Sequence, residues 1–192
     1  MHKDRMEAFS DGVFAILITI MVLELRAPHG AELADLAPLI PTFLCYTMSF
    51  VYLGIYWNNH HHMLQAVKSV DGATLWANNF LLFWLSLVPF ATAWMGENHF
   101  AAIPVAVYGV PLFMAGLAYS ILCGRLIRHD SHSTLARVLS RDLKARVSSV
   151  GYAAAIPLAF LHPAISLFIY VAISILWLVP DTRLEKAVGS GT

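Results

Sequence analysis

The sequence predicts an all-α, polytopic membrane protein in which six transmembrane helices form one domain over residues 1–192. Hydrophobic residues make up 58% of the chain and charged residues only 12%, against about 45–50% and about 25% in soluble domains. The apolar residues come in runs of about 20, the length that a helix needs to cross a bilayer. The basic residues fall almost entirely on one side of these runs, as they do in multi-pass membrane proteins.

Each apolar run except the last corresponds to one helix. The first is interrupted by Glu7, Asp11 and Glu24 and has no small-residue cleavage site after it, so it is not a secretory signal peptide. The second begins through Pro38 and Pro41, which the first turn of a helix tolerates. The six helices are expected at about residues 5–25, 36–60, 73–95, 101–123, 144–161 and 163–179.

Two prolines modify this pattern. Pro89 predicts a kink near the outer end of the third helix. The last apolar stretch, residues 147–179, is longer than one untilted span needs, and His162-Pro163 lies near its middle. Because proline ends a helix at or before the preceding residue, two helices joined by a tight turn are expected here.

The distribution of positive charge places both termini in the cytoplasm. Only Arg26 falls on the outer side of the six spans. A fifth span without a sixth would move the last two basic residues outside, against the preference for basic cytoplasmic segments. The eleven remaining basic residues are Lys3, Arg5, Lys68, Arg125, Arg128, Arg137, Arg141, Lys144, Arg146, Arg183 and Lys186.

Several classes of function are disfavoured. The formal net charge of zero leaves no basic excess for nucleic acid. The spans contain no His-Glu-x-x-His motif, nucleophile elbow or carboxylate pair, so an enzyme is not expected. The only sizeable soluble segment, residues 124–146, is expected to be a membrane-surface helix, with lipid binding or regulation as the alternative.

One face of the first helix is a candidate ion pathway. At 100° per residue, Ile16, Thr19, Ile20 and Leu23 share this face, whereas Asp11 points about 140° away from Ile16. Periodicity alone explains the stripe equally well as a lipid-facing surface, a packing surface or a pore lining.

The polar residues at the start of this helix have two interpretations. Ionisable groups inside a span often form ion-binding or proton-relay sites. The favoured interpretation is instead a structural network in which Arg5, Phe9, Ser10 and Asp11 tie the first helix to the second and third helices, because buried charges usually need partners. The candidate partners are Trp57, His60 and Asn79, with Asn58 and Asn78 as alternatives.

The histidine run 60–62 is not expected to bind a metal. Consecutive residues of a helix point about 100° apart, so three neighbours do not converge readily on one ion. Packing or pH sensing by one of them is the preferred interpretation. No cofactor is expected.

The run Arg-x-x-x-Phe-Ser-Asp-Gly-Val-Phe-Ala-Ile-x-x-Thr at residues 5–19, which includes Phe9, resembles the signature of the transmembrane protein 175 family. Residues 75–79 and 87–90 also resemble the third span of that family. Its members are potassium-permeable channels of lysosomes with prokaryotic homologues. The animal proteins carry two six-span repeats and this chain has one, so the resemblance is to the prokaryotic form.

This resemblance implies a potassium channel of the prokaryotic plasma membrane, a homotetramer whose four first helices line a central pore. It assigns the pore constriction to Ile16, and the shared face adds Thr19 and Leu23 on successive turns outward. The alternative is a proton-coupled secondary transporter that uses Asp11 and a histidine as a relay. Such a transporter needs alternating access, for which the sequence shows neither a pseudo-repeat nor a pair of broken helices.

Overall fold

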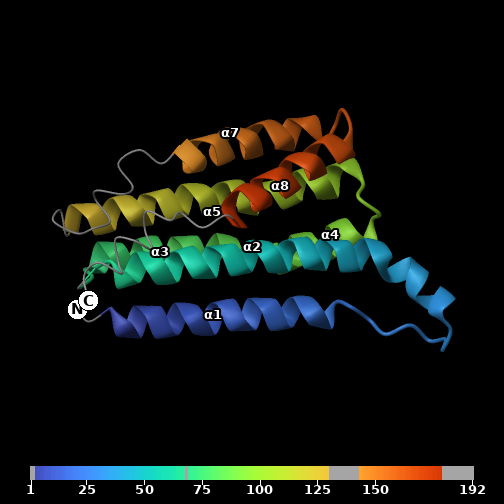
Figure 1. Ribbon diagram of the computed structural model, residues 1–192, viewed down its shortest axis with the longest axis horizontal. Coiled ribbons are helices and arrows are strands. Elements are labelled where there is room, and N and C mark those ends of the chain that lie inside the picture. Colours follow the sequence, from blue (N-terminus) through green and yellow to red (C-terminus); the bar gives the residue numbers. More distant parts are fainter. Residues whose placement is uncertain (1–2, 68, 130–142, 179–192) are drawn as a thin grey trace.

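The computed structural model describes residues 3–67, 69–129 and 143–178, which are helical apart from short connections. Figure 1 shows the helices lying side by side along the long axis of the molecule, with α1 at one edge and α7 at the opposite edge. The elements are α1 (Asp4–Leu23), the 3₁₀-helix η1 (Leu33–Leu39), α2 (Ile40–Gln65), α3 (Gly72–Ser86), α4 (Val88–Glu97), α5 (Ala102–His129), α7 (Leu143–Leu158) and α8 (Pro163–Leu178).

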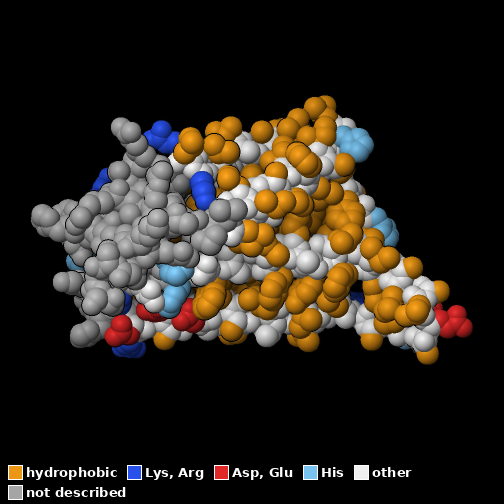
Figure 2. Space-filling view, viewed as in Figure 1, with side chains coloured by type: hydrophobic (Ala, Val, Ile, Leu, Met, Phe, Trp, Pro, Cys, Tyr) orange, Lys and Arg blue, Asp and Glu red, His pale blue; other side chains and the backbone are white. Residues whose placement is uncertain are grey.

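The predicted all-α fold with six helices is confirmed, with α3 and α4 forming two parts of one apolar segment. Within the described ranges, four segments are long and apolar enough to cross a membrane: Asp4–Leu23, Leu33–Gln65, Gly72–Glu97 and Ala102–His129. The apolar helix α8 is shorter, and α7 has 16 residues. Hydrophobic side chains cover the middle of the molecule in Figure 2, whereas charged side chains gather toward its two ends.

Local sequence explains where the helices begin and end. Asp71 caps α3 by accepting hydrogen bonds from the backbone nitrogen and the hydroxyl of Thr74, at 2.8 and 2.6 Å. These two bonds hold the pKa of Asp71 below its usual value. The span of α3 and α4 is interrupted at Leu87, two residues before Pro89, and the α7–α8 chain turns at His162-Pro163, as the prolines predict.

The hairpin of α7 and α8 packs against α5, which also contacts α3 and α4. Gly109 of α5 permits a close crossing, because a Cβ atom there would overlap the hydroxyl of Tyr170 on α8. That hydroxyl donates to the carbonyl of Val105 at 3.1 Å. The hairpin is therefore held by close packing and by a buried hydrogen bond.

Some sequence predictions lie outside the described residues. The expected surface helix with Arg137 and Arg141 falls mainly on residues 130–142, and Lys68, Arg183 and Lys186 also lie outside the described ranges.

Candidate ion pathway along the first helix

Helix α1 has one face covered by its own subunit and one face uncovered. The covered residues recur every three or four positions and pack against the other helices; they are Met6, Ser10, Phe14, Leu17 and Met21. The residues of the uncovered face follow the same spacing on the other side of the helix: Arg5, Ala8, Phe9, Gly12, Ala15, Ile16, Thr19, Ile20 and Leu23. Asp4 and Val22 are exposed beside this face. A continuous stripe along the whole helix is thus free to face lipid, water or another subunit.

The three residues of the expected constriction all lie on this free stripe. Ile16 is 57% exposed and Leu23 77% exposed, and Thr19 is exposed between them. The hydroxyl of Thr19 donates to the carbonyl of Ile16 at 2.9 Å, so the lone pairs of its oxygen point away from the helix backbone. By contrast, Ile18 is half-buried and packs against the core.

The stripe changes character along its length. Its first half carries the small residues Ala8, Gly12 and Ala15, and a Cβ atom at Gly12 would meet nothing within 4 Å. Its second half carries the large apolar side chains of Ile16 and Leu23. Arg5 and the exposed ring of Phe9 also lie in the first half, so the small residues alternate with larger side chains there.

A buried chain of hydrogen bonds joins α1 to α3 and α2. The Ser10 hydroxyl donates to the carbonyl of Met6 at 2.8 Å, so its oxygen accepts from the amide nitrogen of Asn78 at 3.0 Å. The amide oxygen of Asn78 then faces Nε2 of His60 at 2.7 Å, which makes His60 the donor. Nδ1 of His60 consequently carries a lone pair, and it is buried with no hydrogen-bond partner among the described residues.

A second set of contacts joins α1 to α2 nearer the surface. The indole nitrogen of Trp57 donates to the carboxylate of half-buried Asp11 at 2.9 Å. Nδ1 of His61 lies 3.0 Å from the carboxylate of Glu7, and the rings of Trp57 and His61 stack with centroids 6.0 Å apart. Lys3 donates to the backbone carbonyl at position 64, at the end of α2, at 2.7 Å.

The structure brings together four of the seven residues expected in the network. Ser10 and His60 meet through Asn78, and Asp11 meets Trp57. Asn79 is exposed, because it points about 100° away from Asn78 on the same helix. Arg5 and Phe9 lie on the free stripe of α1, and within the described part of the chain neither makes a side-chain hydrogen bond.

The contact between Glu7 and His61 was not anticipated from the sequence. A signal for it exists, because Glu7 and Asp11 are four residues apart on one helix and Trp57 and His61 are four residues apart on the next. Equal spacing on two adjacent helices allows both pairs to meet. The histidines of α2 diverge, since His60 points to Asn78 and His61 to Glu7.

The chain is similar to bacterial channel proteins over almost its whole length. A family model described as the endosomal/lysosomal potassium channel TMEM175 matches residues 5–89. A potassium channel of Chryseobacterium sp. (strain P1-3) is 50% identical over 98% of both chains, and one of Streptomyces collinus is 30% identical over 86% of both.

A solved structure shares this fold. The crystal structure of a lysosomal potassium-selective channel TMEM175 homolog from Chamaesiphon minutus superposes with a TM-score of 0.81 at 27% identity, over 92% of this chain and 96% of that one. These relatives are channels and not enzymes. The chain is therefore a multi-pass membrane protein that belongs to the TMEM175 potassium-channel family.

Proposed function

We propose that this chain forms a homotetrameric potassium channel of the cell membrane and that the free stripe of α1 lines its pore. The observation that carries the proposal is the uncovered face of α1, which continues from Arg5 to Leu23 without a packing partner among the described residues of its own subunit. The names of its relatives in Chryseobacterium and Streptomyces support potassium as the permeant ion.

An assembly is needed because one helix face does not enclose a path for an ion. Subunits arranged around a symmetry axis would bring their free stripes together, so that each residue of the stripe becomes a ring. The family resemblance supplies the number four. The same arrangement would cover the exposed apolar side chains of Ile16 and Leu23 from the bulk solvent.

The stripe supports a weak preference for potassium. Rings of Ile16 and Leu23 form a dry neck, in which an ion loses part of its hydration shell. Potassium gives up water more readily than sodium, so a dry neck favours it without strong binding. The hydroxyl oxygens of Thr19 would offer ligands between the two apolar rings. The sequence has no Thr-Val-Gly-Tyr-Gly loop, which provides carbonyl ligands in other potassium channels.

The basic residues support cytoplasmic termini. Basic residues from three helices lie at one end of the spans: Lys3 and Arg5 at the start of α1, Arg125 and Arg128 at the end of α5, and Lys144 and Arg146 near the start of α7. Cytoplasmic ends of membrane helices are enriched in such residues.

The test measures potassium and sodium flux through the purified protein in liposomes. It compares the wild type with Ile16→Asn and with the matched control Ile18→Asn. Asparagine at position 16 would replace a dry ring by amides that hydrate an ion, so potassium flux should rise severalfold and the preference over sodium should fall. Ile18 faces the core, so Ile18→Asn should lower the yield of folded protein but leave the preference of the surviving channels unchanged.

Two results would contradict the proposal. One is a change of ion preference in Ile18→Asn with wild-type behaviour in Ile16→Asn, which would assign the pore to the other face of α1. The other is the absence of unitary current steps in planar bilayers, which would favour a carrier.

A further inference from the structure

The three consecutive histidines at the end of α2 lie in different environments. His60 is fully buried and donates to Asn78. His61 has 35% of its side chain exposed, and its ring meets the carboxylate of Glu7. His62 is half-buried, and no hydrogen bond of its ring is among the described contacts. Because histidine changes its charge near neutral pH, these environments decide which of the three can take up a proton.

The hydrogen bonds of His61 belong to a neutral ring that can accept a second proton. The amide nitrogen of Gln65 lies 2.7 Å from Nε2, and since an amide nitrogen only donates, Nε2 accepts. Nδ1 therefore carries the proton and donates to Glu7 at 3.0 Å. Gln65 is exposed, so its amide can turn and present its oxygen once Nε2 is protonated. The ring can thus gain a proton and keep both contacts.

A positive charge on His61 would be stabilised from two sides. The contact with Glu7 would become an ion pair, so Coulomb attraction would add to the hydrogen bond. The ring of Trp57 stacks on His61 with an angle of 18° between the ring planes, and the face of an indole attracts a cation. A charge on His60, by contrast, would be removed from water completely. Protonation of the histidine run is therefore favoured at His61.

Glu7 is the charged residue bonded to His61 among the described contacts. Lys3 donates to a backbone carbonyl of α2, and Asp11 accepts from Trp57, so both are engaged elsewhere. The described charged or titratable residues at this end of the spans, on the elements that contact α2 and on those beside them, are Lys3, Asp4, Arg5, Glu7 and Asp11 on α1, His60 and His62 on α2, Asp71 before α3, Arg125, Arg128 and His129 on α5, and Lys144 and Arg146 on α7.

We propose that His61 senses the pH at this end of the spans and that its protonation tightens the contact between α1 and α2. In acid, the ion pair with Glu7 adds to the bond between Asp11 and Trp57, one turn further along α1. As the pH rises, His61 loses its second proton and the ion pair becomes a hydrogen bond to a neutral ring. Control of conduction by this contact rests on the proposed function, in which α1 lines the pore and this end faces the cytoplasm.

Trp57 reports the charge of His61 directly, because a protonated imidazole quenches the fluorescence of an indole stacked on it. The full chain in liposomes is titrated from about pH 8 to about pH 5, where histidine changes its charge. The difference between wild type and Trp57→Phe isolates the signal of this residue from the other tryptophans. We expect the Trp57 signal to fall as the pH falls. It should not depend on pH in His61→Gln, whereas the matched control His62→Gln should titrate like the wild type.

The melting temperature measures the strength of the contact. On acidification, the Tm of the wild type should rise relative to that of His61→Gln by about 1–3 °C, the effect of one partly exposed ion pair in a chain of this size. Glu7→Gln keeps a hydrogen-bond acceptor but removes the negative charge, so it should abolish this rise.

Three results would overturn the proposal: a Trp57 signal that titrates equally in His61→Gln, a titration that is lost in His62→Gln instead, and a rise of Tm that survives Glu7→Gln. Potassium flux tests the control of conduction. Its pH dependence should be weaker in His61→Gln than in the wild type, and equal pH dependence would reject that control. A wild type without potassium flux would contradict the proposed function alone, because quenching and Tm do not require conduction.

Discussion

The buried chain Ser10–Asn78–His60 allows a prediction of stability, tested by Asn78→Leu. Leucine has a similar size but makes neither of the two hydrogen bonds of Asn78, at 2.7 and 3.0 Å. It also leaves Nε2–H of His60 without a partner, in a side chain that has no exposed surface. His60 would then have both ring nitrogens unpaired, because Nδ1 has no partner among the described residues.

The expected loss follows from these contacts. Hydrogen bonds between membrane helices contribute about 0.6 kcal/mol each on average, and an unpaired buried donor costs about 1–3 kcal/mol. The free energy of unfolding should therefore fall by about 2 kcal/mol or more. For a chain of this size, that corresponds to a Tm lower by at least about 4 °C.

Two buried thiols make this measurement simple. Cys45 and Cys123 are both buried, so a thiol-reactive fluorogenic dye labels them as the protein unfolds on heating. The matched control is Asn79→Leu, which makes the same chemical change at an exposed neighbour. Its Tm should change by no more than about 2 °C. If Asn79→Leu lowers Tm as much as Asn78→Leu, the assignment of Asn78 to the network is refuted.

Three further substitutions have expected outcomes. Thr19→Val keeps the shape of the side chain but removes its hydroxyl, so liposome flux should show a lower preference for potassium over sodium with total flux little changed. Asp11→Ala should lower Tm by less than Asn78→Leu does, and by as much as Trp57→Phe, because both remove one partly exposed hydrogen bond. Gly109→Leu should reduce the yield of folded protein, since the new side chain overlaps Tyr170. Overpacking a core lowers the free energy of unfolding by about 1–3 kcal/mol. A wild-type yield and Tm for Gly109→Leu would contradict the close crossing of α5 and α8.

The helices were predictable from the sequence because their signals are local. Runs of apolar residues set their lengths, and His162-Pro163 and Pro89 marked the turn and the interruption. The stripe of α1 was also predictable, because helical periodicity alone groups Ile16 with Leu23.

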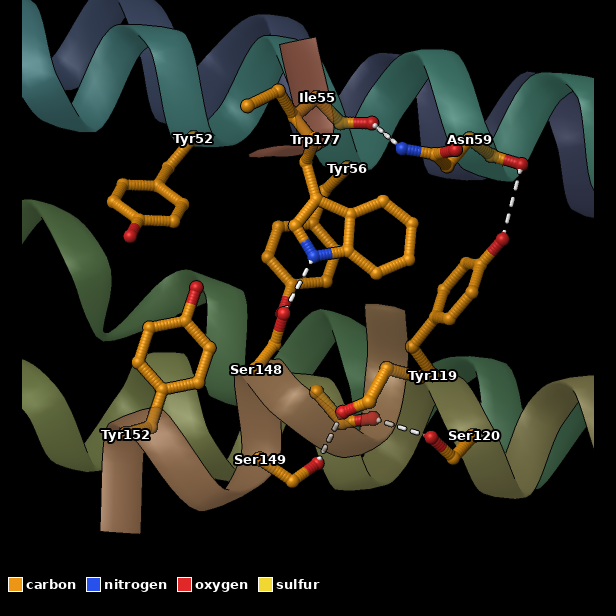
Figure 3. Close-up of a pocket in the computed structure, with 12 residues that line it drawn as sticks. Tyr52, Ile55, Tyr56, Asn59, Tyr119, Ser120, Ser148, Ser149, Tyr152 and Trp177 are labelled. Carbon is orange, nitrogen blue, oxygen red and sulfur yellow. Dashed lines mark hydrogen bonds between the residues drawn. The ribbon is translucent and has the colours of Figure 1, made fainter. Parts of the chain in front are cut away.

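Contacts between side chains of different helices were harder to predict from the sequence. The choice between Asn78 and Asn79 depends on the rotation of α3 about its axis, which follows from packing against α5 and α1. A pocket between α2 and the α5–α7 pair is lined by aromatic side chains, among them Tyr52, Tyr119 and Trp177 (Figure 3). It depends on the spacing between these helices, and no pattern along the chain encodes that spacing. The contact of Glu7 with His61 was partly predictable. The four-residue spacing of the polar residues can be read from the sequence, but the sequence does not show which helix lies opposite.

The hydrogen bonds of α1 are confined to one half of the helix. Hydrogen bonds to other elements are made by the side chains of Lys3, Glu7, Ser10 and Asp11. Among the described contacts, the side chains after Asp11 touch other helices only by apolar packing. Hydrogen bonds therefore fix the start of the helix, whereas apolar contacts alone hold the rest of it. Measured from Asp11, Ile16 lies about 8 Å along the axis and Leu23 about 18 Å. If α1 lines a pore as proposed, a tilt about its hydrogen-bonded end would displace Leu23 roughly twice as far as Ile16. The width of the pore would then change most at the level of Leu23.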